Sequence, residues 1–110
     1  MKELQWVGSS HNDLRCFPPK ARRIAGRELR RVQSGLDPHD RKALPTAGAG
    51  VWEIRVRIGQ EFRVLYVAKF EEAVFVLHAF EKKTAKTSRP DIELARARYR
   101  EALQRIRRLP

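Results

Sequence analysis

The sequence has few of the residues on which several common classes of protein depend. There is one cysteine, Cys16, in 110 residues, so no internal disulfide can form and a reducing, cytoplasmic setting is expected. The histidines His11, His39 and His78 are isolated from one another, which predicts no metal site. No apolar run is long enough to span a bilayer, and the N-terminus turns polar too early for a signal peptide. We therefore expect no membrane association.

Acidic residues are also scarce. Against 13 Asp and Glu there are 24 Lys and Arg, which gives a net charge of +11 and an isoelectric point near 10.9. Such an excess attracts polyanions and speeds the encounter with nucleic acid or with an acidic protein. A merely solubilising role is the alternative, but solubility rarely requires so lopsided a balance. The composition therefore favours a nucleic acid or a ribonucleoprotein as the target.

The hydrophobic patterns predict one α+β domain that spans residues 1–110. Short apolar or alternating segments indicate strands, and apolar residues at helical spacing indicate helices. The predicted order is β-α-α-β-β-β-α, with a twisted antiparallel sheet and the helices packed on one of its faces. Ser88 and Asp91 have the spacing of a capping box at the start of the last helix. The predicted ranges are 2–8 for the first strand, 11–16 and 20–34 for the first helices, 36–50 for a loop and 51–83 for three strands.

The predicted helix over 20–34 has one face made almost entirely of arginine. Its apolar residues recur near helical spacing, and the cations occupy the remaining surface. Most such faces are simply solvated, and a direct contact with RNA is the alternative. The arginines are Arg22, Arg23, Arg27, Arg30 and Arg31.

Three arginines lie inside the predicted strands of 51–83. Period two puts Glu53, Arg55 and Arg57 on one face of the first of these strands, opposite an apolar face that begins with Trp52. The same face can receive Lys82 or Lys83 from the last strand. Several cations would then share the surface with one acid, Glu53, and such a surface suits a phosphodiester backbone. These two lysines and the three arginines are therefore the candidate site.

The position of Arg63 depends on the turn at Gly59. A two-residue turn would pair Val56 with Arg63 and direct Arg63 toward the core, whereas a three-residue turn would pair Arg57 with Arg63 and keep the arginines on one face. Opposed like charges cost up to about 1 kcal/mol, and a phosphate between them would offset that cost. A buried, unpaired arginine would cost more. We therefore favour the three-residue turn.

RNA cleavage at such a surface requires three contributions. One group takes the proton of a 2′-hydroxyl, another protonates the leaving oxygen, and a third stabilises the charge on phosphorus. Lysine transfers protons only where desolvation or nearby cations favour its neutral form, while arginine stabilises phosphate through bidentate contacts. The pattern brings no histidine to this surface, because His78 lies mid-strand among apolar residues and is expected in the core.

The segments W-E-I-R-V-R, F-R-V-L-Y and V-L-H-A-F-E-K-K-T, followed by a helix near P-D-I-E-L-A, resemble the RelE/ParE toxin superfamily. The resemblance is greatest to its phage-derived, HigB-like branch and covers Leu4 to Leu103. It implies a RelE-like toxin of a type II toxin–antitoxin module that enters the ribosome and cuts mRNA. Attack by the RNA's own 2′-hydroxyl would need no metal or cofactor. A cognate antitoxin, often with a helix-turn-helix, would neutralise the toxin.

The resemblance also assigns roles to particular residues. Arg55, Arg63, Lys82 and Lys83 match catalytic cations of the superfamily, and Arg57, Lys86 and Arg89 are expected to bind RNA. Tyr66 closes the R-V-L-Y motif, where packing is expected. Glu53 departs from the pattern, because some ribosome-dependent relatives have a lysine there.

Two alternatives keep the basic surface but change its function. One is a toxin of the same fold that acts on DNA gyrase and is not a nuclease. The other is a non-catalytic module that binds RNA or DNA with a salt dependence set by the phosphates it contacts.

Overall fold

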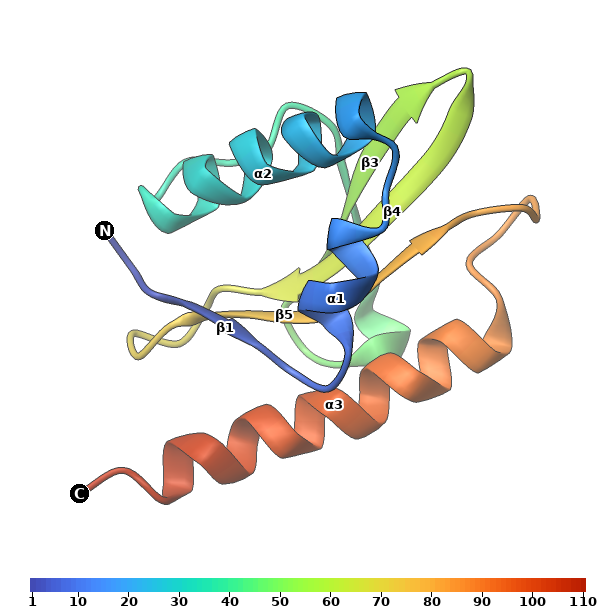
Figure 1. Ribbon diagram of the computed structural model, residues 1–110. Coiled ribbons are helices and arrows are strands. Elements are labelled where there is room, and N and C mark those ends of the chain that lie inside the picture. The colour runs from blue at the N-terminus through green and yellow to red at the C-terminus, as the bar shows by residue number, and fades with distance from the viewer.

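The computed structural model describes residues 1–110 as a five-stranded sheet with three α-helices and one short 3₁₀ helix (Figure 1). The α+β class and the mainly antiparallel sheet are confirmed. In chain order the elements are β1 (Leu4–Trp6), α1 (Ser10–Arg15), α2 (Pro19–Gln33), β2 (Arg41–Ala43), η1 (Pro45–Ala47), β3 (Val51–Ile58), β4 (Gln60–Val67), β5 (Val74–Glu81) and α3 (Arg89–Arg107).

The centre of the sheet is the antiparallel meander β3–β4–β5, and the strand order is β1-β5-β4-β3-β2. β1 is an edge strand that pairs in parallel with β5, and β2 is the opposite edge, antiparallel to β3. β2 and η1 lie in the segment 36–50, which the sequence predicted to be only a loop. β2 consists of Arg41, Lys42 and Ala43, which do not alternate between apolar and polar, whereas the equally short β1 has Leu4 and Trp6 on either side of Gln5; only β1 therefore shows a strand pattern.

The helices lie on both faces of the sheet rather than on one (Figure 1). α1 and α2 pack on the face that carries Ile54 and Val64, and α3 packs on the face that carries Leu65 and Phe75. The reason is that β4 and β5 are buried on both sides, with every residue from 62 to 67 and from 73 to 79 buried. A strand with two buried faces requires cover on each.

The start of α3 is fixed to the sheet by polar contacts. Ser88 is the N-cap and its hydroxyl oxygen accepts a hydrogen bond from the Asp91 backbone N–H at 3.3 Å, which confirms the predicted cap. One Asp91 carboxylate oxygen lies 2.7 Å from His78 Nε2 on β5. These contacts hold the first turn of α3 against the end of the meander, where the candidate site lies.

Gly59 alone connects β3 to β4, so both predicted turns are wrong. The observed register pairs Arg55 with Arg63 and Arg57 with Glu61. The favoured three-residue turn would shift the pairing of the two strands by two residues, and an even shift leaves each side chain on the same face. It therefore predicted the correct face for Arg63 but the wrong partner. The tight connection uses a φ of +91° at Gly59, a region that side chains with a Cβ rarely adopt.

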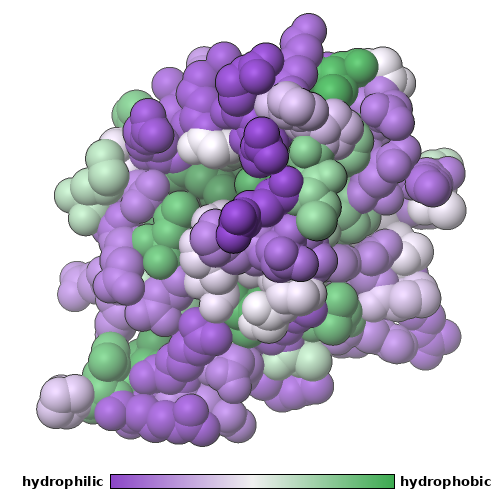
Figure 2. Space-filling view, viewed as in Figure 1, coloured by the Kyte–Doolittle hydropathy of each residue, from purple (hydrophilic) through white to green (hydrophobic).

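The exposed surface is mostly polar. The view in Figure 2 is mainly hydrophilic, with hydrophobic residues in small, separate patches. None of the helices is both long enough and apolar enough to cross a membrane.

Two glycine-to-alanine substitutions are expected to have opposite effects on the free energy of unfolding. Gly59→Ala should lower it by about 1–2 kcal/mol, because the new side chain is strained at a left-handed φ. Gly26→Ala should raise it by about 0.5–1 kcal/mol, because Gly26 lies inside α2 and its new methyl group would meet no atom within 4 Å. Urea unfolding measures both, and a Gly59→Ala protein as stable as the wild type would contradict the tight turn.

Candidate functional site

A small cleft of about 170 Å³ opens between the sheet and the start of α3. Lys42 contributes from β2, where it pairs in register with Glu53, and Lys82 and Lys86 contribute from the segment after β5. Glu53 is buried, so three lysines line a cleft whose one carboxylate is hardly reached by solvent. The complete lining is Lys42, Leu44, Glu53, Lys82, Lys86, Thr87 and Ile92.

Beneath the cleft, Arg63 and Glu53 form a buried ion pair. Their side chains are 1% and 2% exposed, and Arg63 Nε lies 3.1 Å from Glu53 Oε1. Arg63 also donates through Nη1 to the Phe62 carbonyl at 3.1 Å and through Nη2 to Glu61 at 2.8 Å. The Thr87 hydroxyl donates to the other oxygen of Glu53. A buried charge pair is tolerated only with such additional hydrogen bonds.

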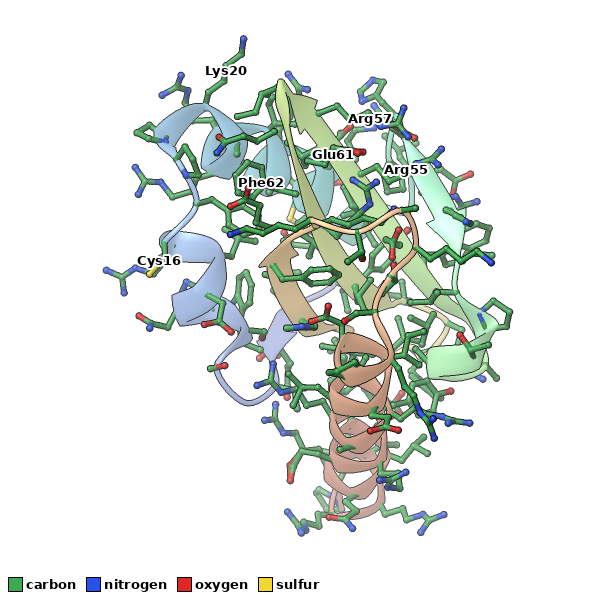
Figure 3. The ribbon with its side chains drawn as sticks, turned by 90° about the vertical axis from the view of Figure 1, so that its right-hand side faces the viewer. Cys16, Lys20, Arg55, Arg57, Glu61 and Phe62 are labelled. Carbon is green, nitrogen blue, oxygen red and sulfur yellow. The ribbon has the colours of Figure 1, made fainter.

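Glu61 is the partly exposed carboxylate of the site. The hydrogen bond from Arg63, and then the positive charge of that guanidinium, hold the pKa of Glu61 below its ordinary value. Arg57 adds to this effect from the opposite strand, with Nε 3.4 Å from Glu61 Oε1. Figure 3 shows Glu61, Arg55 and Arg57 together along the β3–β4 hairpin. Glu61 is therefore an ionised carboxylate among cations.

Arg55 is held by an acid from the loop before β2. Its Nε donates to Asp40 Oδ1 at 2.8 Å, and its backbone N–H donates to the Asp40 carbonyl at 2.9 Å. Arg57 Nε lies 3.9 Å from the other Asp40 oxygen. Arg57 is 56% exposed, twice as much as the 28% of Arg55, so Arg57 is the freer of the two to meet a ligand.

The structure brings together five of the seven sequence-predicted site residues. Arg55 and Arg57 lie along the hairpin, Lys82 and Lys86 line the cleft, and Arg63 lies below it. Arg63 does not reach solvent, and its guanidinium is occupied by two carboxylates, Glu53 and Glu61.

The other two predicted residues lie outside the cleft. Lys83 is exposed and makes no side-chain hydrogen bond or ion pair, and Arg89 is 88% exposed and pairs with Glu93 on the outside of α3.

Sequence reasoning missed most of the polar partners at this site. Asp40 and Lys42 come from the segment predicted to be a loop. Glu61 lay inside the predicted turn, and Thr87 lay in a connection with no pattern. The signal that was available for Glu61 is its alternation with Arg63 along β4, which puts both on one face.

No imidazole reaches the cleft. His78 is 8% exposed and pairs with Asp91 through Nε2, while its Nδ1 has no hydrogen-bond partner. His39 pairs with Glu28 of α2 through Nδ1 at 2.8 Å. No group of three His, Cys, Asp or Glu side chains converges to hold a metal ion.

A larger cleft, of about 260 Å³, lies near the other end of the β3–β4 pair. Arg41 there stacks over Trp52 at 3.5 Å from the ring centroid, and burial raises the pKa of Tyr66. Two of its cations are already engaged, Arg41 with Asp37 and Lys2 with backbone carbonyls of the β4–β5 connection. In the smaller cleft Lys82 donates to the Ala85 carbonyl at 3.0 Å, while the Lys42 and Lys86 side chains have no hydrogen-bond or ion-pair partner, which makes this cleft the better candidate for an anionic ligand.

The fold and the cleft together define a class: a small α+β domain with helices on both faces of its sheet and a cationic cleft beside its central hairpin. Residues 12–100 match the family described as Phage derived protein Gp49-like (DUF891), and the chain belongs to this family. The family is generally associated with RelE-like toxins, which indicates a phage-derived toxin of the toxin–antitoxin type with an antitoxin as partner. Among curated proteins, none matches the chain.

Removing Arg63 is expected to destabilise the fold strongly. Arg63→Ala leaves Glu53 buried without its counter-charge, which should lower the free energy of unfolding by about 3–5 kcal/mol. Arg57→Ala removes an exposed guanidinium from the same hairpin and should change stability by no more than about 0.5 kcal/mol. Denaturant unfolding of both variants measures the difference, and equal effects would contradict a structural role for Arg63.

Acid should weaken the fold in part through Glu61. Because its pKa is lowered in the folded state, its contribution to stability is complete above the ordinary glutamate value of about 4.3 and is lost as the pH falls through the folded value. Glu61→Gln should therefore lose less stability than the wild type between about pH 5 and pH 3. Unfolding curves across this range test the difference, with the exposed, unpaired Glu71→Gln as the control that should follow the wild type.

Proposed function

We propose that the chain is a HigB-like toxin that cleaves mRNA on the ribosome, with residues 1–110 forming one RelE-like domain. The observation that carries the proposal is the cleft lined by Lys42, Lys82 and Lys86, whose one acid, Glu53, is buried and paired with Arg63. Its charge favours a phosphate group, and Arg57 extends the cationic surface along the hairpin. Action on ribosomes would take place in the cytoplasm.

The groups around the cleft can supply the three parts of 2′-hydroxyl chemistry. Glu61 is ionised and accepts the proton of the 2′-hydroxyl as its oxygen attacks the adjacent phosphorus. The bond from phosphorus to the 5′-oxygen breaks, and Lys82 donates a proton to that oxygen. Lys86 and Arg57 stabilise the charge that develops on the phosphate oxygens. The products are a 2′,3′-cyclic phosphate and a free 5′-hydroxyl, with no metal in the reaction.

The absence of an imidazole from the cleft favours dependence on a ribosome. An ionised glutamate is a weaker base than a histidine, so proton transfer alone would give a slow enzyme. Holding the 2′-oxygen in line with the phosphorus contributes far more, and free single-stranded RNA is too flexible for this. A ribosome that fixes the mRNA backbone would supply the missing orientation.

The antitoxin partner is expected to cover the same cations. An acidic segment laid over Lys42, Lys82 and Lys86 would neutralise the surface to which phosphate binds. The segment would then act both by charge and by steric exclusion of RNA.

Cleavage by purified protein on translating ribosomes tests the proposal. Glu61→Gln should lower the rate by about 10²- to 10⁴-fold through loss of the base. The variant also loses the charge that pairs with Arg63, so circular dichroism and melting curves verify that it is folded before the rates are compared. Lys82→Ala should lower the rate by a similar factor through loss of the acid. Lys83→Ala should lower the rate much less, because the Lys83 side chain lies outside the cleft. Arg96→Ala, an exposed position on α3, is the control for a general loss of positive charge.

Intact message with the wild-type protein would refute the nuclease proposal. A DNA damage response without translation arrest would then favour a toxin that acts on DNA gyrase. Wild-type cleavage that Glu61→Gln leaves unchanged would instead remove Glu61 from the mechanism and leave the nuclease in place.

A further inference from the structure

A row of four cations runs along α2 on the side that faces away from the sheet. Lys20, Arg23, Arg27 and Arg30 are all exposed, and they follow the i, i+3, i+7, i+10 spacing of a single helix stripe. The residues of α2 that pack on the sheet, such as Ala25 and Leu29, lie on the opposite side of the helix. The hydrophilic upper edge of the view in Figure 2 lies over α2.

The four side chains have no acidic partners. None of them takes part in an ion pair or a side-chain hydrogen bond, in contrast to the hairpin arginines. The one acid of α2, Glu28, is 4% exposed and is occupied by His39, with Arg31 at 3.9 Å. Neighbouring like charges on a helix repel one another, so the row destabilises the isolated helix and favours a bound polyanion.

The row has the dimensions of a nucleic-acid backbone. From Lys20 to Arg30 the helix rises about 15 Å, at about 1.5 Å per residue. A duplex carries about one phosphate per 1.7 Å of helix axis, counted over both strands. A row of this length therefore lies beside several phosphates, on whichever strands face the helix.

We propose that this row is a docking surface for the phosphodiester backbone of a double-stranded nucleic acid. Proteins that bind single strands stack bases on aromatic side chains, and every exposed large hydrophobic residue of this chain is aliphatic. Tight protein interfaces commonly centre on aromatic anchors as well as arginines, and the stripe contains no aromatic residue. Backbone phosphates require only the cations that are present.

The row lies on a different side of the molecule from the cationic cleft. α2 covers one face of the sheet and the cleft opens on the α3 face. Figure 3 shows Lys20 on one side of the β3–β4 hairpin and Arg55 and Arg57 on the other. A duplex on α2 leaves the cleft open, so this inference does not rest on the proposed nuclease activity.

The test measures binding of the purified full chain to an RNA duplex and to a DNA duplex of the same sequence, by fluorescence anisotropy over a series of salt concentrations. DNA has no 2′-hydroxyl, so the result does not depend on cleavage. Changing Lys20, Arg23, Arg27 and Arg30 to Ala should reduce the slope of log affinity against log salt by about three to four, and weaken binding at least about tenfold at physiological salt.

A matched variant separates the row from the net charge. Changing Arg96, Arg100, Arg107 and Arg108 of the α3 region to Ala removes the same four charges from the overall +11, and its slope should change by less than about one. A variant with the three arginines of the row changed to Lys keeps the charge and should retain the slope. Circular dichroism and melting curves verify folding, which exposed alanines in a helix favour.

Three results would overturn the proposal. Duplex binding that survives the change of the α2 row would remove the row from the interface. An equal loss of affinity in the α2 and α3 variants would show that binding depends on net charge alone. Binding of a polyglutamate peptide as tight as that of the duplexes, at the same salt, would assign the row to an acidic protein instead.

Discussion

The buried pair of Arg63 and Glu53 is the contact on which the organisation of the site depends. It joins β4 to β3, and through the Thr87 hydroxyl it joins both strands to the segment before α3. The same guanidinium holds Glu61 at the surface in its ionised form. The buried Arg63 thus orients two acids, Glu53 below the cleft and Glu61 beside it. Loss of either partner of such a pair would leave a buried charge, so neither residue can be replaced alone without a large loss of stability.

Much of the fold could be predicted because its signals are local. Apolar residues at helical spacing predict α2, and the alternation of side chains predicts the polar face of β3. The start of α3 is predicted by the spacing of Ser88 and Asp91. The second covered face of the sheet was missed, because a strand that is apolar throughout does not say which helix lies on which side. β2 was missed because its residues, Arg41 to Ala43, do not alternate between apolar and polar.

The cations of the site were predicted from the sequence, whereas the acids Asp40 and Glu61 were missed. Arg55 and Arg57 stand out as charges inside a strand, whereas Asp40 is joined to them only in three dimensions. Lys82 and Lys83 are adjacent and equivalent in the sequence. Only the direction in which the chain leaves β5 decides that Lys82 lines the cleft and Lys83 does not. Because Gly59 alone connects β3 to β4, Arg63 lies against Glu61 and Glu53. Arg63 is therefore a buried support of the site and not its exposed centre.

The parallel pairing of β1 with β5 also constrains how the chain assembles. Residues 4–6 can pair only after residues 74–76 have been made, and α1 and α2 have no sheet to cover until the meander exists. The N-terminal third of the chain is therefore synthesised before its docking surface. Contacts so distant in sequence slow folding, and they make it concerted rather than stepwise from the first residue. A truncated product that stops before β5 would lack the pairing partner of β1 and the cleft residues that follow β5.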